Sequence, residues 1–313
     1  MQSIMRVCLL FLLVCCLTGC SNNMPPIEEN TSTETSQKPP VLTGWQNAGG
    51  EQFYLLEDGS RATGWLELGE DRYYFNETGI LQTGWLELDG ERFYLRADGT
   101  MARGKTVIDG KSFFFTSQGA PILLVNPWNP IPDGYEPDLV PISSSVSYAG
   151  RKIDRHCHDP LMEMITDCKE QTGSKMYIVS AYRDHETQTI NFNKEVQSFI
   201  SAGYSREDAL VEAAKSVAVP GTSEHQLGLA VDIIDTKLWK LSAAQADLPG
   251  QQWLMENCWR YGFILRYPEN KTDVTGIIYE PWHYRYVGTK VAAELHESGI
   301  TLEEYLDSLT RHM

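Results

Sequence analysis

The sequence is short of basic residues. Its 313 residues include 42 Asp and Glu but only 26 Lys and Arg, which gives a formal net charge of −16 at pH 7. Proteins bind nucleic acids mainly through cationic contacts to phosphates, so this deficit argues against a nucleic-acid partner. Beyond residue 17, the chain also lacks a hydrophobic run long enough to cross a membrane. The length leaves room for a catalytic domain and a second part.

Cysteine is scarce outside the N-terminus. Four of the seven cysteines lie within the first 20 residues, and only Cys157, Cys168 and Cys258 follow. Cys168 and Cys258 each occupy an inward position of a predicted helix, which would allow one disulfide and leave one free thiol. Three small buried thiols are an equally good alternative.

The first 20 residues have the composition of a secretory signal. Arg6 is the only charged residue before Cys20, and an apolar run, VCLLFLLVCCL, covers residues 7–17. This run is too short for a mature membrane helix. The following LTGC, residues 17–20, resembles a bacterial lipoprotein signal. The resemblance implies that residues 1–19 are removed and that Cys20 carries a lipid.

Either a lipoprotein signal or a plain secretory signal with an unrelated cysteine would place the mature protein outside the cytoplasm. With the lipid, the protein is expected on the outer side of the bacterial cytoplasmic membrane, in contact with the cell wall. Residues 20–42 are polar, rich in Ser, Thr and Pro, and poor in apolar side chains. Such a segment buries too little surface to fold, so we predict a disordered tether.

A 20-residue repeat occupies residues 43–122. Its tryptophans and tyrosines recur in register at Trp45, Trp65 and Trp85 and at Tyr54, Tyr74 and Tyr94, and the fourth unit carries Lys105 and Phe114 in these places. Each unit has the pattern of a strand, a glycine turn and a second strand, which predicts a hairpin. One hairpin is unstable alone. We therefore predict an all-β solenoid of stacked hairpins that bury each other's aromatic rings.

These units resemble the choline-binding type of cell-wall-binding repeat found on surface proteins of Gram-positive bacteria. In that family, aromatic rings of neighbouring units form cages for a quaternary ammonium group. The tryptophan that usually follows the hairpin glycine by two residues is replaced here by Gln52, Arg72, Arg92 and Ser112. The resemblance implies attachment to the cell wall, and the replaced residues favour a wall glycan or polymer over choline. A purely structural spacer is the third possibility.

From residue 123 to residue 313 the repeat disappears and the pattern becomes that of an α+β domain. Apolar periodicity predicts helices over 159–172 with Asp159 as N-cap, 186–200, 206–218 with Ser205 as N-cap, 250–262, 289–299 and 301–309. Short strands are predicted over 175–183 and 227–234, and one or two strands over 276–288. This mixture predicts a small antiparallel sheet with flanking helices.

The segment GTSEHQLGLAVDI, residues 221–233, places an aspartate inside an apolar strand. A buried carboxylate is costly unless it is paired or bound to a metal ion. A catalytic zinc site needs three protein ligands and one open position, and His225 and Asp232 supply two. Among the other histidines, His283 stands out because Glu280 precedes it by three residues, where a general base for water would be needed.

Several motifs in order resemble one enzyme family. SEHQLGLAVD and EPWHYRYVG, together with SAYRDHETQ and WLMENCWRYGFILRYP, are similar to the VanY-type metallo-carboxypeptidases, which are zinc D-alanyl-D-alanine carboxypeptidases with L,D-carboxypeptidase relatives. The resemblance covers residues 153–313. It implies that one Zn²⁺ is bound by His225, Asp232 and His283.

The same resemblance implies roles for further side chains. Glu280 would take a proton from the attacking water and later pass it to the leaving amine. Arg183 would place a positive charge near the scissile carbonyl and the terminal carboxylate of the substrate. Gln188, Ser223 and Tyr267 would line the peptide pocket.

The expected function is removal of the terminal D-alanine from a peptidoglycan stem peptide by an enzyme that its repeats hold at the wall. An L,D-carboxypeptidase that trims the tetrapeptide stem is the alternative within the family. A surface protein without catalysis is the third hypothesis, but a binding-only domain has no use for Glu280 beside the metal ligands.

Overall fold

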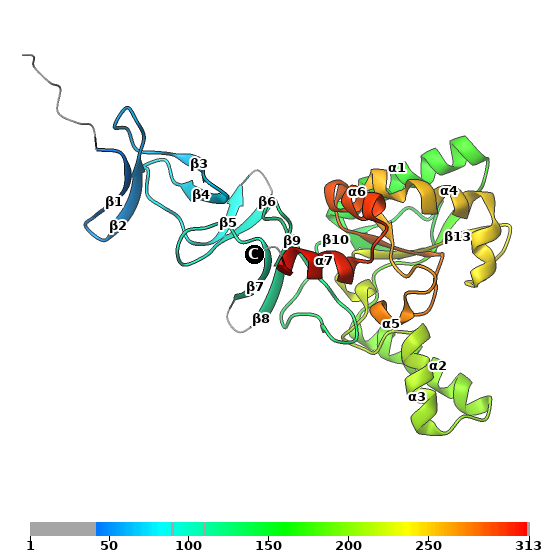
Figure 1. Ribbon diagram of the computed structural model, residues 1–313. Coiled ribbons are helices and arrows are strands. Elements are labelled where there is room, and N and C mark those ends of the chain that lie inside the picture. The colour runs from blue at the N-terminus through cyan, green and yellow to red at the C-terminus, as the bar shows by residue number, and fades with distance from the viewer. Residues whose placement is uncertain (1–41, 89–90, 109–110, 312–313) are drawn as a thin grey trace, which may run out of the picture. The chain divides into compact units, whose positions relative to one another are not determined.

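The computed structural model describes residues 42–88, 91–108 and 111–311 (Figure 1). The predicted signal peptide, Cys20 and all of the predicted tether except Leu42 lie outside these residues. From Thr43 onward the chain forms one structural unit, in which β-hairpins precede an α+β region. Within the described ranges, no helix is both long enough and apolar enough to cross a membrane.

The repeats fold into successive antiparallel hairpins, as predicted. Their strands are β1 (Gly44–Ala48) and β2 (Glu51–Leu55), β3 (Gly64–Leu68) and β4 (Asp71–Phe75), β5 (Gly84–Leu88) and β6 (Glu91–Leu95), and β7 (Gly104–Ile108) and β8 (Lys111–Phe115). A short strand, β9 (Pro121–Ile122), adds to the last hairpin.

Aromatic contacts link each hairpin to the next. Trp65 lies opposite Tyr74 in its own hairpin, with ring centroids 5.2 Å apart, and its ring also meets Phe93 of the following unit at 5.0 Å. Both contacts are edge-to-face, the geometry that aromatic pairs prefer. The recurring glycine has a steric reason. At Gly99, where φ is +84°, a Cβ would lie 2.6 Å from the Leu81 side chain of the preceding unit.

The α+β region begins after the last hairpin. Its helices are α1 (Arg155–Thr172), α2 (His185–Ser201), α3 (Arg206–Ser216), α4 (Pro249–Asn257), α5 (Thr272–Thr275), α6 (Thr289–Ser298) and α7 (Leu302–Arg311), with 3₁₀ turns η1 (Glu224–Leu227), η2 (Ala243–Asp247) and η3 (Cys258–Tyr261). Its strands are β10 (Leu139–Pro141), β11 (Lys152–Asp154), β12 (Met176–Ser180), β13 (Ala230–Asp235), β14 (Phe263–Leu265) and β15 (His283–Tyr286).

The predicted small antiparallel sheet is confirmed. It has the strand order β12-β13-β15-β14, with every neighbouring pair antiparallel. The apolar face of α1 packs on it, so that Leu161 and Met164 share a buried core with Ile178 of β12 and Ile233 of β13. Every residue of β13 is buried. Asp232 is therefore held inside the protein by the strand that carries it.

A second core joins the last repeat to the α+β region. Phe114 of β8 and Ile122 of β9 pack with Leu295 of α6 and with Tyr305 and Leu306 of α7. The predicted boundary near residue 122 separates two folding patterns, but the side chains on either side of it share one apolar cluster.

Three local predictions were wrong in part. Helix α1 starts at Arg155 because the Asp154 side chain accepts a hydrogen bond from the His156 backbone N–H at 3.0 Å, so Asp159 is not the N-cap. Pro160 is accommodated inside the helix. The helix predicted over 250–262 divides into α4 and the 3₁₀ turn η3, and the strand predicted over 276–288 is restricted to β15.

The three cysteines of the α+β region are free and buried. No disulfide joins Cys168 to Cys258, and the alternative of small buried thiols describes the structure. Cys168 lies against the Gly250 carbonyl, at 3.4 Å from its sulfur. Burial raises the pKa of Cys168 to about 11 and that of Cys258 to about 12, so both thiols are protonated at neutral pH.

Candidate active site and metal centre

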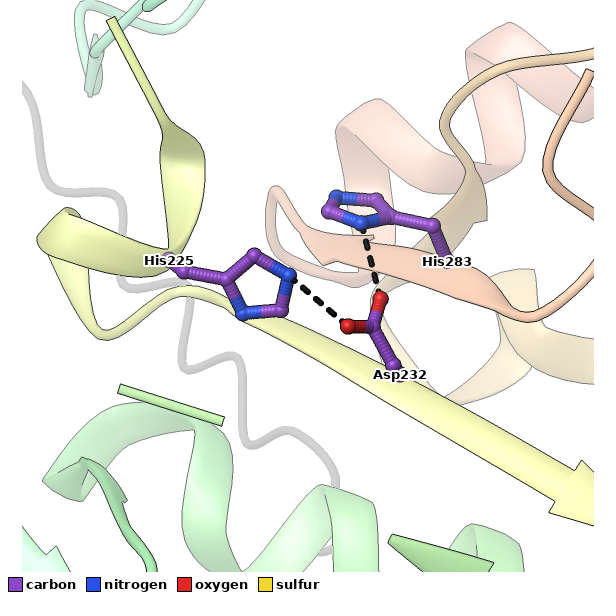
Figure 2. Close-up of side chains that lie close together, drawn as sticks. All are labelled: His225, Asp232 and His283. Carbon is purple, nitrogen blue, oxygen red and sulfur yellow. Dashed lines mark hydrogen bonds and ion pairs between the residues drawn. The ribbon is translucent and has the colours of Figure 1, made fainter. Parts of the chain in front are cut away.

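Three side chains that are distant in sequence converge beside the central sheet. Asp232 of β13 lies directly opposite His283 of β15 in the strand register, so both side chains point to the same face. His225 reaches this face from η1, the turn that precedes β13. Figure 2 shows the Asp232 carboxylate between the two imidazole rings.

The distances are short enough for one ion to contact all three groups. His225 Nε2 lies 3.2 Å from Asp232 Oδ2, and His283 Nδ1 lies 3.0 Å from Asp232 Oδ1. One potential ligand atom from each residue lies within 4.8 Å of the others. In the part of the chain that the structure describes, no other group of three or more His, Cys, Asp and Glu has this arrangement.

The donor set fits a divalent transition metal. His225 Nδ1 lies 2.8 Å from the Ala181 carbonyl oxygen, which requires Nδ1 to carry the proton and leaves the Nε2 lone pair free. That Nε2 is buried and has no hydrogen-bond partner. Two imidazole nitrogens and one carboxylate oxygen, with room for a further ligand, form a set that suits Zn²⁺.

Burial and charge set the protonation of these groups. Burial lowers the pKa of His225 to about 4, and the nearby Arg183 acts in the same direction. Burial also opposes the charged form of His283, but the hydrogen bond to Asp232 and the nearby Glu224 carboxylate outweigh it and raise the pKa of His283 to about 9. Without an ion, His283 is therefore protonated at neutral pH. A metal ion would have to displace this proton.

Glu280 lies at the edge of the three-residue group. Its Oε2 is 3.7 Å from His283 Nδ1, and its backbone N–H donates to the Tyr267 carbonyl at 3.1 Å. Burial raises the pKa of Glu280 to about 8, with the negative charge of Asp232 adding to the effect. A carboxyl group with a pKa near neutrality can both accept and return a proton.

Arg183 follows β12 and faces the same group. Its backbone N–H donates to the His225 carbonyl at 3.2 Å, which ties the two segments together. Its buried Nε has no hydrogen-bond partner. Burial lowers the pKa of Arg183 from its usual value, although the charges of Asp232 and Glu280 act against this. A guanidinium group still remains charged in proteins and can bind a carboxylate or a developing oxyanion.

All of the residues predicted for the catalytic site except Gln188 line one cavity of about 350 Å³. Its lining includes Arg183, Ser223, His225, Asp232, Tyr267, Glu280, Trp282 and His283. Gln188 does not line the cavity. Its side-chain amide is fully buried and donates to the Ala218 carbonyl at 2.6 Å, so it supports the loop that does line the cavity. A separate cavity of about 190 Å³ between η3 and α6 holds none of the predicted residues.

The sequence reasoning missed a buried ion-pair network behind the site. Glu224, Arg266 and Arg285 are each at most 1% exposed, and Glu224 accepts hydrogen bonds from both arginines. The available signal was Arg266 directly after the apolar strand β14 and Arg285 inside β15, because a buried guanidinium group is costly unless a carboxylate pairs with it. Trp282, which lies between Pro281 and His283 and lines the cavity, was also missed.

Comparisons with known proteins agree with this geometry. The VanY family model, described as D-alanyl-D-alanine carboxypeptidase, matches residues 150–289. The choline-binding repeat model matches residues 42–81 and 62–105. The chain is 40% identical to a D-alanyl-D-alanine carboxypeptidase of Enterococcus faecalis, over 60% of this chain and 66% of that protein. It is 37% identical to YodJ of Bacillus subtilis, over 61% of this chain and 68% of that protein. The chain thus spans about two thirds of each relative.

Solved structures of carboxypeptidases are also similar to this chain. A variant of the D,D-pentapeptidase VanY from a VanB-type resistance cassette, in complex with Zn(II), is 40% identical to this chain and has a TM-score of 0.53. The match covers 59% of this chain and 97% of that one. The LdcB LD-carboxypeptidase is 34% identical, with a TM-score of 0.53, over 66% of this chain and 94% of that one.

The site geometry predicts that one Zn²⁺ binds per chain and that Asp232 is indispensable for it. Asp232→Ala removes the carboxylate between the two imidazoles and should weaken Zn²⁺ binding at least about 100-fold, more than the loss of an outer partner of a ligand does. Competition with a chromogenic chelator measures the affinity. His185→Ala, which changes an exposed histidine at the start of α2, is the control and should bind as the wild type does. Equal affinity of the Asp232 variant and the control would refute the assignment.

Proposed function

The chain belongs to the VanY family of D-alanyl-D-alanine carboxypeptidases, and from this premise we propose that it is a zinc-dependent hydrolase that removes the terminal D-alanine from peptidoglycan stem peptides. The observation that carries the proposal is the convergence of two histidines, an aspartate, a glutamate and an arginine on one cavity. A binding-only protein would not need a proton acceptor beside a candidate metal centre.

We assign His225, Asp232 and His283 as the zinc ligands. When bound there, Zn²⁺ would polarise the scissile carbonyl and make water a better nucleophile at neutral pH. The donor set supports zinc, and a relative that is 40% identical has been solved with Zn(II). The nearby positive charge would also favour the ionised form of Glu280, although burial alone raises its pKa to about 8.

Glu280 moves the proton in this proposal. One of its carboxylate oxygens accepts a proton from the attacking water as the C–O bond forms at the scissile carbonyl carbon. The same carboxyl group then donates the proton to the leaving nitrogen as the C–N bond breaks, which releases D-alanine as a free amine. Its place 3.7 Å from His283 Nδ1 keeps this oxygen next to the reacting atoms.

In this proposal, Arg183 recognises the C-terminal end of the substrate peptide. Its guanidinium, whose Nε has no hydrogen-bond partner, lies in the wall of the cavity, where it binds the terminal carboxylate of the substrate or the oxygen of the scissile carbonyl. Ser223 and Tyr267 line the same cavity and shape the peptide pocket, and Gln188 acts through the loop at Ala218. Recognition of a free carboxylate restricts the enzyme to the last residue of a stem.

The proposed substrate is the pentapeptide stem, which ends in D-Ala-D-Ala. The family model and the Enterococcus faecalis relative are named for D-alanyl-D-alanine. Cleavage of the tetrapeptide stem, after an L-configured residue, is the alternative because the LdcB LD-carboxypeptidase is also similar to this chain.

We propose that residues 43–122 attach the enzyme to the cell wall and that residues 123–313 carry the catalysis. In two repeats an arginine of the chain lies over the ring of the repeat tryptophan. The Arg72 Cζ lies 4.2 Å from the Trp65 ring centroid, and the Arg92 Cζ lies 4.3 Å from that of Trp85. A quaternary ammonium ligand would have to displace these guanidinium groups. A wall glycan or polymer is therefore favoured as the ligand over choline.

We further propose that Cys20, outside the described residues, carries the lipid that anchors the protein to the outer face of the membrane. Residues 21–42 would span the distance from the membrane to the repeats.

Glu280→Gln tests the proton transfer. The amide cannot accept a proton but keeps nearly the same shape, so Zn²⁺ binding should persist while kcat falls at least about 100-fold. D-alanine release from pentapeptide and tetrapeptide stems, followed by mass spectrometry with and without a chelator, measures this. Release from the pentapeptide stem supports the proposal, and release from the tetrapeptide stem alone would support the alternative. A variant with full turnover would exclude Glu280 as the base.

Arg183→Ala tests recognition of the chain end. The wild type should prefer a pentapeptide with a free carboxylate over its C-terminal amide by about 100-fold in kcat/KM, because a charged hydrogen bond is worth roughly 1.5–3 kcal/mol. The variant should lose most of this preference. An undiminished preference would show that another group binds the carboxylate.

The repeats should not bind choline. The wild-type protein is expected to sediment with purified cell wall but to pass through a choline-derivatised matrix. The double variant Arg72→Trp/Arg92→Trp removes both tethered cations and adds aromatic rings, so it should be retained on this matrix. Arg61→Trp, which removes a guanidinium that lies over Phe53 instead, is the matched control and should gain no retention. Choline-dependent retention of the wild type would contradict the prediction.

A further inference from the structure

Glu224 is a fully buried carboxylate next to His225, in the turn η1. Its Oε1 accepts two hydrogen bonds of 2.8 Å, one from Arg266 Nε and one from Arg285 Nη1. The arginines come from the end of β14 and from β15. The carboxylate is therefore fixed by two neighbouring strands of the sheet.

The arginines are themselves anchored at their far ends. Arg266 donates to both carboxylate oxygens of Glu303 in α7, from Nη1 at 2.9 Å and from Nη2 at 2.5 Å. Arg285 Nη2 donates to the Leu123 carbonyl, directly after β9, at 2.7 Å. The C-terminal helix and the end of the repeats thus brace the two groups that hold Glu224.

The second oxygen of Glu224 faces His283. Glu224 Oε2 lies 3.6 Å from His283 Nε2, and both atoms are buried and lack a hydrogen-bond partner. The other ring nitrogen, Nδ1, lies 3.0 Å from Asp232. A histidine that binds a metal ion through one nitrogen commonly donates its other N–H to a carboxylate, which fixes the tautomer and the ring orientation. A small rotation of the His283 ring would turn the 3.6 Å approach into such a bond.

Burying such a network costs desolvation free energy. Two carboxylates and two guanidinium groups leave water, and apolar side chains of similar size often stabilise a fold as well or better. Stability alone therefore gives no reason to keep it. A carboxylate held immobile beside a metal-ligating ring gives one.

We propose that Glu224 is a positioning residue for His283. It accepts the Nε2–H of the ring, so that Nδ1 presents its lone pair to the metal ion, and Arg266 and Arg285 hold it in place. This inference rests on the proposed metal centre and adds a residue that the ligand set itself does not contain.

Glu224→Gln in the full-length protein tests the proposal. The amide replaces a charged acceptor, so Zn²⁺ affinity in chelator competition should fall about 10- to 100-fold. With Co²⁺ as the probe, the ligand-field absorption bands should shift or lose intensity, because the imidazole is no longer held in one orientation. A purely structural role of Glu224 would lower the melting temperature but leave the Co²⁺ spectrum of the folded protein unchanged.

Two further variants make the result decisive. Glu224→Asp keeps the charge between the arginines but withdraws the carboxylate from His283, so it should fold and still lose about 10-fold in Zn²⁺ affinity. Glu304→Gln changes a neighbouring α7 carboxylate that pairs with Lys271 at 2.7 Å, outside the network, and should match the wild type.

Folded Glu224 variants with wild-type Zn²⁺ affinity and an unchanged Co²⁺ spectrum would overturn the proposal. If Glu224→Gln does not fold, the Zn²⁺ affinity and Co²⁺ spectrum of the Glu224→Asp variant test the proposal. A wild-type protein that binds no Zn²⁺ would instead overturn the proposed function.

Discussion

The structure depends on one interaction, the contact of the buried Asp232 carboxylate with two imidazole rings. Asp232 is 5% exposed in a strand whose every residue is buried, so an unpaired charge there would destabilise the sheet. The direct pairing of Asp232 with His283 in the strand register brings the second ring within 3.0 Å. The turn η1 then has to place only His225 beside this pair. Sheet register and metal-ligand geometry are thus two consequences of the same pairing.

The residues around Asp232 and the two histidines differ between the cavity side and the side behind the cavity. On the cavity side, Glu280 and Arg183 have perturbed pKa values, and Arg183 also has unused hydrogen-bonding capacity, which suits groups that act on a substrate. Behind the cavity, Glu224 is saturated at one oxygen by two arginines, which suits a group that must not move. Arg285 also reaches the chain directly after the last repeat, so the proposed wall-binding module and the metal centre share part of one buried framework.

Features that are visible in short stretches of the sequence could be predicted, and contacts between distant residues could not. The proposed ligands and Glu280 were found because a histidine, a buried aspartate and a carboxylate near a second histidine are together typical of a catalytic metal site, and the motif resemblance supplied Arg183. The repeats were found because aromatic and glycine positions recur every 20 residues. The start of α1 was missed because Asp154 and Asp159 are both of a residue type that caps helices, and the sequence does not show which side chain accepts the backbone N–H; in the structure Asp154 accepts that of His156. The partners of Arg266 and Arg285 were missed because they lie between 37 and 162 residues away in the chain.

Anomalous diffraction at the zinc absorption edge, from crystals of the full chain, tests the central claim most directly. We predict a single strong peak per chain, in contact with His225 Nε2, an oxygen of Asp232 and His283 Nδ1, with Glu280 nearby but not coordinated. A zinc-loaded crystal whose only peak lies elsewhere, or in which the three side chains bind no metal, would contradict this assignment.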